Sequence, residues 1–235
     1  MYLNINTMKV TLSFEESAGE DVSIMVDALR ASTTITLALN NFKKIIPCFT
    51  PDEAISLKEN HGGILAGERG GKKLEGFDIG NTPTLLKDFK TSEDTLILTT
   101  SNGTRILENM TSKVLVGSMV NAEECAKKAV QLAQNHIDVV MAGVKGEFAI
   151  EDFLASGEIL YWICKNLNEC ELSEYAKASI LASRDYRAVK KAFEESSSGR
   201  RLSKLGYDND VRLCCEKNIT DNVAIYINKE LHLYI

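Results

Sequence analysis

Residues 22–34 read VSIMVDALRASTT, and this stretch decides the class of fold. A short, mostly apolar run is followed at once by Asp27, by Arg30 and by three hydroxyl residues. Such a run, ending in small polar residues, is typical of a strand that is covered on both faces and leads into a helix. The pattern returns at 95–105, TLILTTSNGTR, which again ends in small polar residues and one arginine, Arg105.

Strands and helices are predicted to alternate along most of the chain. Strands are predicted at 9–14, 22–26, 44–49, 63–67, 95–99, 113–116 and 137–142. Helices are predicted from residue 51, at 121–134, at 150–167, at 173–193 with one break, and at 201–205 before Gly206; a hairpin is predicted at 223–234. We therefore expect an α/β fold of three layers, α/β/α, with a mixed, largely parallel sheet, a C-terminal helical segment and a terminal hairpin.

Length and composition narrow the class of protein. A chain of 235 residues suits a single domain, 1–235, with a C-terminal subdomain from about residue 150. Lys and Arg number 27 against 33 Asp and Glu, a net charge of −6 that argues against nucleic acid as a partner. No apolar run approaches the roughly 20 residues of a membrane helix, and the start lacks the pattern of a signal peptide. We expect a cytoplasmic protein with no membrane partner; a homodimer is compatible with this composition.

Four predicted strand ends carry clusters of polar residues, at 27–34, 67–72, 100–105 and 143–152. Ligands of open α/β sheets bind beyond the carboxyl ends of strands. Arginines and helix N-terminal amides suit a phosphate or sulfonate, and carboxylates suit Mg²⁺ when substrate oxygens and water complete its coordination. Together the clusters predict a phosphate site with Mg²⁺.

Each cluster also has a structural explanation, in which Asp27 caps a helix and Arg30 pairs with a neighbouring acid. Known phosphate-binding motifs are absent, so they do not decide between a phosphate site and the structural explanation. The chain has no GxxxxGK[ST] loop, no GxGxxG after a strand, and no cysteine followed six residues later by arginine. Its three histidines are too scattered for a histidine-based centre.

The ordered motifs resemble those of the 2-phosphosulfolactate phosphatase family. They are DALRASTT (27–34), GERGG (67–71), GFDIGNTP (76–83), TTSNGTR (99–105), GSMVNA (117–122), FAIEDF (148–153), SGRRL (198–202) and GYDNDV (206–211). The chain departs from the family pattern at Ala28, Thr82, Ser101 and Ser156, where Val, Ser, Thr and Ala are expected. The resemblance implies Mg²⁺-dependent hydrolysis of 2-phospho-3-sulfolactate to 3-sulfolactate and phosphate, a reaction of coenzyme M biosynthesis.

Residues and resemblance together predict the roles of individual side chains in a metal-assisted phosphomonoesterase acting on a small anionic phosphorylated substrate. The predicted catalytic residues are Asp27, Arg30, Arg69 and Asn102. The predicted Mg²⁺ ligands are Asp27, Asp78, Glu151 and Asp152. The predicted substrate-binding residues are Ser32, Thr33, Gly70, Gly71, Gly103, Thr104, Arg105 and Arg200.

Two other functions stay open at this point: a broad-specificity phosphatase of small phosphorylated hydroxy acids, and a non-catalytic anion-binding protein on the same fold. Sulfonate and carboxylate both pair with arginine, so residue types do not separate the substrates. A phosphorylated Asp27 and direct attack by water are both consistent with these residues.

Overall fold

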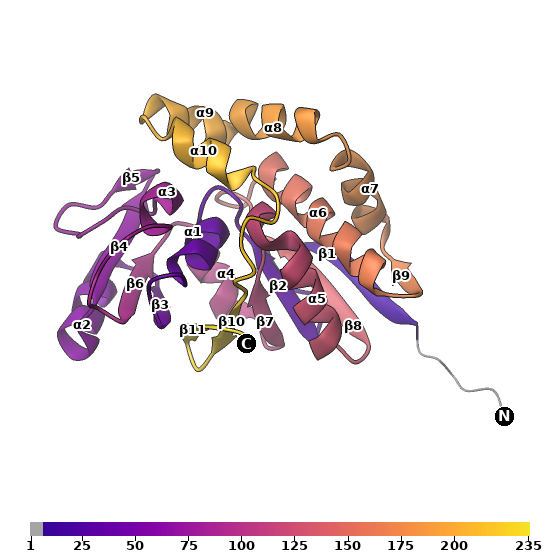
Figure 1. The fold of residues 1–235 in the computed structure, drawn as a ribbon, viewed down its shortest axis with the longest axis horizontal. Helices are drawn as coiled ribbons and strands as arrows, with labels where there is room; N and C mark the ends of the chain where they lie inside the picture. Colours follow the sequence, from indigo (N-terminus) through magenta and orange to yellow (C-terminus); the bar gives the residue numbers. More distant parts are fainter. Residues whose placement is uncertain (1–6) are drawn as a thin grey trace.

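The computed structural model describes residues 7–235, in which eleven strands form one mixed sheet with helices on both faces (Figure 1). The strands are β1 (Met8–Phe14), β2 (Val22–Val26), β3 (Lys44–Cys48), β4 (Ile64–Arg69), β5 (Lys72–Lys73), β6 (Thr95–Thr99), β7 (Lys113–Val116), β8 (His136–Met141), β9 (Cys170–Leu172), β10 (Ala224–Ile227) and β11 (Glu230–Leu233). The helices are α1 (Ala31–Ala38), α2 (Pro51–His61), α3 (Pro83–Leu86), α4 (Gly103–Asn109), α5 (Ala122–Leu132), α6 (Ile150–Asn166), α7 (Glu174–Ala182), α8 (Tyr186–Glu195), α9 (Ser197–Lys204) and α10 (Asp208–Cys214), with a 3-10 turn at Met119–Asn121.

The predicted fold class is confirmed. All seven predicted strands exist, the terminal hairpin is β10 and β11, and the helical stretch at 173–193 breaks once, between α7 and α8. Four strands or α-helices were not predicted: β5, β9, α3 and α10. The first two contain only two and three residues, too few to show any periodicity in the sequence.

The sheet has two parallel groups of strands joined by the C-terminal hairpin. Its order is β5-β4-β6-β3-β11-β10-β7-β2-β8-β1-β9. Strands β3, β6 and β4 are parallel to one another, and so are β7, β2, β8, β1 and β9. The hairpin is antiparallel within itself, β11 is antiparallel to β3, and β10 is antiparallel to β7. These three successive reversals make the two parallel groups run in opposite directions along the sheet.

Curvature of the sheet brings the two groups together at one site. In a flat sheet, opposite directions would place their carboxyl ends at opposite edges. Here one pocket is lined by residues that follow β2 and β8 of one group and β4 and β6 of the other. The sheet therefore bends around the hairpin, and Figure 1 shows the two groups on either side of α1, below α9 and α10.

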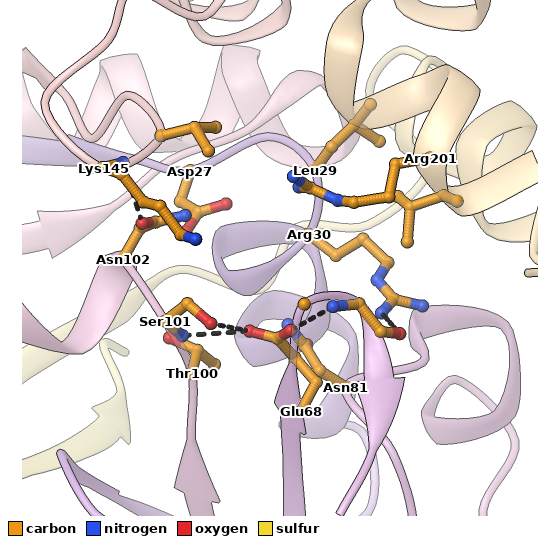
Figure 2. Close-up of a pocket in the computed structure, with 14 residues that line it drawn as sticks. Asp27, Leu29, Arg30, Glu68, Asn81, Thr100, Ser101, Asn102, Lys145 and Arg201 are labelled. Carbon is orange, nitrogen blue, oxygen red and sulfur yellow. Dashed lines mark hydrogen bonds between the residues drawn. The ribbon is translucent and has the colours of Figure 1, made fainter.

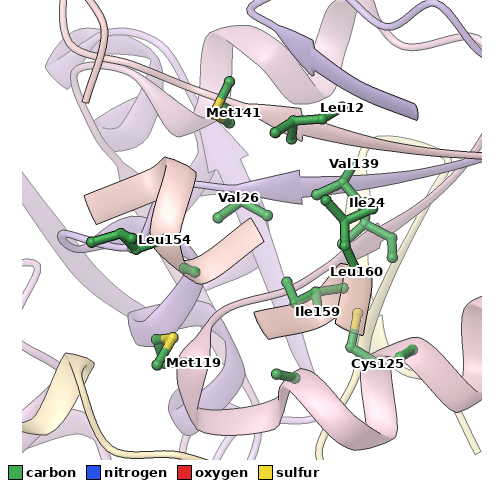
Figure 3. Packing of buried hydrophobic residues seen from close by; sticks show 14 of the residues in the cluster. Leu12, Ile24, Val26, Met119, Cys125, Val139, Met141, Leu154, Ile159 and Leu160 are labelled. Carbon is green, nitrogen blue, oxygen red and sulfur yellow. The ribbon is translucent and has the colours of Figure 1, made fainter. Parts of the chain in front are cut away.

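Strand β2 shows how its sequence suits this position. All five of its residues are buried. Ile24 and Val26 join the cluster under α5 and α6 (Figure 3), whereas Met25 points to the opposite face. On that inner face Met25 belongs to one cluster with Ile45 of β3 and Leu98 of β6. Successive side chains alternate between faces, so an unbroken apolar run is what a strand covered on both sides requires.

Helices α8, α9 and α10 lie above the sheet in Figure 1, and α9 supplies one wall of the pocket. Within residues 7–235, no helix combines the length and the apolar character needed to cross a membrane.

Candidate active site

The pocket at the convergence of the two strand groups encloses about 170 Å³. Its walls come from the residues after β2, β4, β6 and β8 and from α9 (Figure 2). Of the predicted site residues, the pocket brings together Asp27, Arg30, Gly70, Gly71 and Asn102. The prediction that polar strand ends share one site is therefore correct for these residues.

Asp27 is the carboxylate at the centre of this arrangement, and it is only 6% exposed. Its Oδ1 accepts a hydrogen bond from Ala31 N at 3.2 Å, and its carboxylate also accepts one from the backbone N–H of Gly103. A glycine is required at 103 because a Cβ there would lie 2.9 Å from the Ala31 Cβ and 3.1 Å from Asp27 Oδ2. Asp27 thus joins the starts of α1 and α4, as the capping explanation expects.

The pKa of Asp27 is nevertheless raised to about 7. Burial, which penalises the charged form, is the main cause, and the nearby carboxylates of Glu68 and Glu151 add to it. Burial and the charges of Asp27 and Glu151 likewise raise the pKa of Asp152 well above its usual range. The fold thus brings several carboxylates into one buried region, which is typical of functional sites.

Asp152 holds two strand ends together. Its Oδ1 accepts a hydrogen bond from Ala28 N at 2.7 Å, and its Oδ2 accepts one from Gly143 N at 3.0 Å. These residues follow β2 and β8, so the first turn of α6 fixes the spacing of the two strands. Both oxygens are occupied by amides, and Asp152 therefore positions the site rather than offering a free ligand.

Glu68 likewise joins two strand ends, on the other side of the pocket. Its Oε1 accepts hydrogen bonds from the amide and the hydroxyl of Ser101, at 2.9 and 2.8 Å, and its Oε2 accepts one from Gly71 N at 2.6 Å (Figure 2). Glu68 thereby links the end of β4 to the end of β6. This role was not predicted, although GERGG was recognised as a motif.

Arg30 is buried, and an acid from a distant part of the chain balances its charge. Its guanidinium donates to Asp210 of α10 at 2.7 Å and to the Gly71 carbonyl at 2.9 Å, and it lies 4.6 Å from the centre of the Tyr207 ring. Asp210 also accepts hydrogen bonds from the amide and hydroxyl of Thr84. Arg30 lines the pocket, but its pairing with Asp210 matches the structural explanation given above.

Replacing Asp210 with alanine is expected to lower the free energy of unfolding by about 3–5 kcal/mol, because it leaves the buried charge of Arg30 without its partner. Urea denaturation measures this difference. Asp208→Ala is the matched control, since Asp208 is exposed on the same helix and such a change is expected to stay within about 0.5 kcal/mol. A D210A protein as stable as the control would show that the pair contributes nothing.

Six predicted charged residues do not line the pocket, and Glu151, Asp152 and Arg200 are three of them; Glu151 lines a neighbouring hollow with Val144 and Phe148. The other three are Asp78, Arg69 and Arg105. Asp78 is exposed, accepts a hydrogen bond from Leu65 N and pairs with Lys58 at 2.7 Å; these contacts outweigh its partial burial and lower its pKa. Arg69 donates to the carbonyls of Glu68 and Phe49 and to Thr99 Oγ1. Arg105 pairs with Glu15. The structure does not bring these side chains to Asp27 because each is engaged by a partner elsewhere.

The remaining predicted contacts are placed as follows. Ser32 Oγ donates to the Asp27 carbonyl at 2.7 Å and Thr33 Oγ1 to the Ala28 carbonyl at 3.2 Å, and both side chains are fully buried beneath the loop. Arg200 is exposed and does not line the pocket. The Thr104 side chain lies outside the described part of the structure.

Arg201, Lys145 and Asn81 line the pocket and were missed by the sequence analysis. Lys145 lies in the cluster recognised at 143–152, and Asn81 lies in the GFDIGNTP motif, so a signal existed for both. For Arg201 the predicted residue was its neighbour Arg200. Consecutive residues of a helix point about 100° apart, and only the docking of α9 decides which arginine faces the pocket.

A metal ion would find few free carboxylates here. Among residues 7–235, no three His, Cys, Asp or Glu side chains form a group that could hold a metal. Mg²⁺ often binds through only one or two carboxylates, with phosphate oxygens and water as the other ligands. Asp27 and Glu151 fit that requirement: both are buried, their charges repel, and Glu151 has no hydrogen bond or ion pair within the described residues.

Comparison with known proteins shows which proteins have a similar sequence. A family model described as 2-phosphosulpholactate phosphatase matches residues 9–229, a range that includes every residue of the pocket. A protein of Methanothermobacter thermautotrophicus named 2-phosphosulfolactate phosphatase is 46% identical over 226 residues, which is 96% of each chain. Proteins of Clostridium acetobutylicum and Clostridium tetani, both named probable 2-phosphosulfolactate phosphatase, are each 35% identical; the matches cover 92% and 96% of this chain and 94% and 98% of those relatives.

Proposed function

Because the chain belongs to the 2-phosphosulfolactate phosphatase family, we propose that it hydrolyses 2-phospho-3-sulfolactate to 3-sulfolactate and phosphate. The enzyme is a phosphoric monoester hydrolase. The observation that carries the proposal is a small pocket in which a buried carboxylate, Asp27, lies with two cations that have no ion-pair partner among residues 7–235, Lys145 and Arg201. Unpaired cations around a carboxylate suit an anionic substrate whose phosphoryl group meets that carboxylate.

Asp27 is the residue we assign to the phosphoryl group. Whether its carboxylate attacks phosphorus or orients the attacking water, it acts as an anion, and the amides of Ala31 and Gly103 hold it in place. Lys145 and Asn102 lie beside it in Figure 2, and Lys145 N–H donates to Asn102 Oδ1 at 3.3 Å. We assign to Lys145 the neutralisation of the phosphate oxygens and to Asn102 a hydrogen bond to them.

We propose Mg²⁺ as the cofactor, held by Asp27 and Glu151. Of the four ligands predicted from sequence, Asp152 has both oxygens on backbone amides and Asp78 pairs with Lys58 away from the pocket. Burial, with added repulsion from Glu68 and Glu151, raises the pKa of Asp27; a divalent cation would stabilise its charged form and would neutralise charge on the phosphoryl oxygens.

Phosphate release from a panel of substrates tests the function. The panel contains 2-phosphosulfolactate, 2-phospholactate and phenyl phosphate, each with Mg²⁺ and with EDTA. We expect the highest kcat/KM for 2-phosphosulfolactate, loss of turnover in EDTA, and its return on adding Mg²⁺.

Each alternative gives a different outcome in the same assay. Equal kcat/KM for all three substrates would indicate a broad-specificity phosphatase. No phosphate release from any of them would indicate a non-catalytic anion-binding protein. Full turnover in EDTA would remove Mg²⁺ from the proposal.

Several predictions from sequence are carried forward unchanged. They are the single domain with a subdomain from about residue 150, the cytoplasmic location, the link to coenzyme M biosynthesis, the absence of a nucleic-acid partner and the homodimer. We propose them on composition and on family resemblance alone.

A further inference from the structure

Arg201 carries a buried polar atom with no partner. Its Nε is fully buried and forms no hydrogen bond. Its guanidinium has no ion pair within residues 7–235, whereas Arg30 beside it has both a carboxylate and a carbonyl. A buried donor without an acceptor costs free energy, about 1–3 kcal/mol and more for a charged group. An arginine with a purely structural role is expected to have acceptors within the protein, as Arg30 has in Asp210 and the Gly71 carbonyl.

Asn81 presents a second unpartnered polar atom to the same pocket. It follows β5, is only 3% exposed, and its Oδ1 has no hydrogen-bond partner. Turned about its terminal bond, the carboxamide offers its NH₂ donors in place of that oxygen. Half-buried Arg201 and buried Asn81 therefore line one cavity from separate elements, and each has a buried polar atom that the protein leaves unsatisfied, which is the pattern expected of a site that a ligand completes.

The position of Arg201 separates it from the residues assigned to the phosphoryl group. Figure 2 shows its side chain entering from α9, across the pocket from Lys145 and Asn102. Its Nε lies 3.9 Å from the position that a Cβ on Gly71 would occupy. Arg201 and Lys145 thus approach the pocket from different walls, one on the α9 side and one on the β8 side.

Charge in the pocket leaves Arg201 free for a second anionic group. Asp210 balances Arg30, and the oxygens of Glu68 are taken by amides and a hydroxyl. A planar guanidinium donates two parallel hydrogen bonds to a carboxylate or a similar oxyanion, which a lysine cannot do. The pocket is small, so the second anionic group must be within a few bonds of the phosphate.

We propose that Arg201, assisted by Asn81, binds the sulfonate or carboxylate of the substrate and sets its specificity for phosphomonoesters that carry a second anionic group close to the phosphate. This inference rests on the proposed function. It takes the place of Arg69 and Arg105, which were predicted from sequence as a catalytic and a substrate-binding residue but are engaged elsewhere.

The test compares Arg201→Ala with Arg200→Ala. The two arginines are adjacent in α9, yet Arg200 is exposed and outside the pocket, so it controls for lost charge and helix propensity. For each variant we measure kcat/KM for 2-phosphosulfolactate divided by kcat/KM for phenyl phosphate. We expect R201A to lower this ratio about 10–100-fold, the effect of one charged hydrogen-bonded contact, and R200A to keep the wild-type ratio.

Arg201→Lys refines the test because it keeps the charge and removes the planar fork. It is expected to restore less than half of the lost ratio on a logarithmic scale. An unchanged ratio in R201A, or an equal fall in R200A, would overturn the proposal. Thermal melting checks that R201A is folded, which we expect because Arg201 contributes no hydrogen bond through Nε.

Binding of 3-sulfolactate, followed by calorimetry, separates this proposal from the proposed function. The compound carries the sulfonate and carboxylate but no phosphate, so its affinity does not depend on catalysis. We expect R201A to weaken binding at least about tenfold and R200A to leave it unchanged. Binding of 3-sulfolactate that R201A does not weaken would contradict the role of Arg201 even in an active enzyme. Arg201-dependent binding without phosphate release would contradict the proposed reaction alone.

Discussion

Asp27→Asn is expected to lower kcat for 2-phosphosulfolactate by about a thousandfold or more, while the protein stays folded. Removing the carboxylate that acts on the reacting group typically has an effect of this size. Asparagine has nearly the same shape and keeps one oxygen that can accept the amide hydrogen bond from Ala31, so the start of α1 keeps this contact. Phosphate release at saturating substrate, in the presence of Mg²⁺, measures the loss.

Stability as a function of pH tests whether the loss of activity in D27N comes from unfolding. The pKa of Asp27 rises from 3.8 to about 7 on folding, so the native state holds a proton that the unfolded chain has released between these values. Wild-type stability from this group is therefore full below about pH 4 and is lost as the pH rises to about 7. The asparagine of the D27N variant does not titrate and avoids this loss.

We therefore expect the Tm of D27N minus the Tm of the wild type, both measured without metal, to be higher at pH 8 than at pH 5. Differential scanning calorimetry at both values checks the expectation. If D27N instead melts well below the wild type at pH 8, and its inactivity follows from unfolding, then Asp27 is a structural cap and the catalytic assignment is wrong.

Removal of residues 223–235 is expected to abolish cooperative folding. The deletion takes away β10 and β11, the strands through which β3 and β7 are joined, together with Ala224 and Leu231, which are completely buried. Both parallel groups would be left with an open apolar edge, and the cluster they share on the inner face would lose two members. Near-ultraviolet circular dichroism and thermal melting of the truncated chain measure the result.

A point substitution in the hairpin measures how much one of its buried side chains stabilises the protein. Leu231→Ala is expected to lower the free energy of unfolding by about 2–5 kcal/mol, because it leaves a cavity in the shared cluster. Leu233 lies two residues further along the same strand but is 40% exposed, so Leu233→Ala is the matched control, with an expected cost below about 1 kcal/mol. Equal costs, together with a truncated chain that still melts cooperatively near the wild-type temperature, would show that the hairpin does not hold the sheet together.

Sequence patterns predicted the elements well where a run was long enough to show its periodicity. Strand β2 was predicted with its observed bounds because five buried residues in a row leave little ambiguity. Helix α10 was missed because its seven residues are too few for an amphipathic pattern to emerge, and its most important residue, Asp210, faces Arg30 rather than solvent. The acid that pairs with a buried arginine 180 residues away cannot be recognised from local sequence.

The candidate site was predicted in part, for a similar reason. Asp27, Gly71 and Asn102 follow strands directly, so the rule that ligands bind at carboxyl ends placed them correctly. The rule does not say where a long side chain points. Arg69 ends β4 and Arg105 lies in the first turn of α4, but nearer partners engage their guanidinium groups, and Arg201 of α9 lines the pocket instead.

By itself, the sequence determined the α/β class, the order of strands and helices, the family, and the polar residues at each strand end, because these depend on local periodicity and on short motifs. Only the tertiary structure decided that the two parallel groups meet. The hairpin reverses the strand direction between them, so their carboxyl ends share a pocket only because the sheet bends around β10 and β11. That bend depends on side chains far apart in sequence, such as Met25, Ile45 and Leu231, packing into one cluster, and no local pattern encodes their contact.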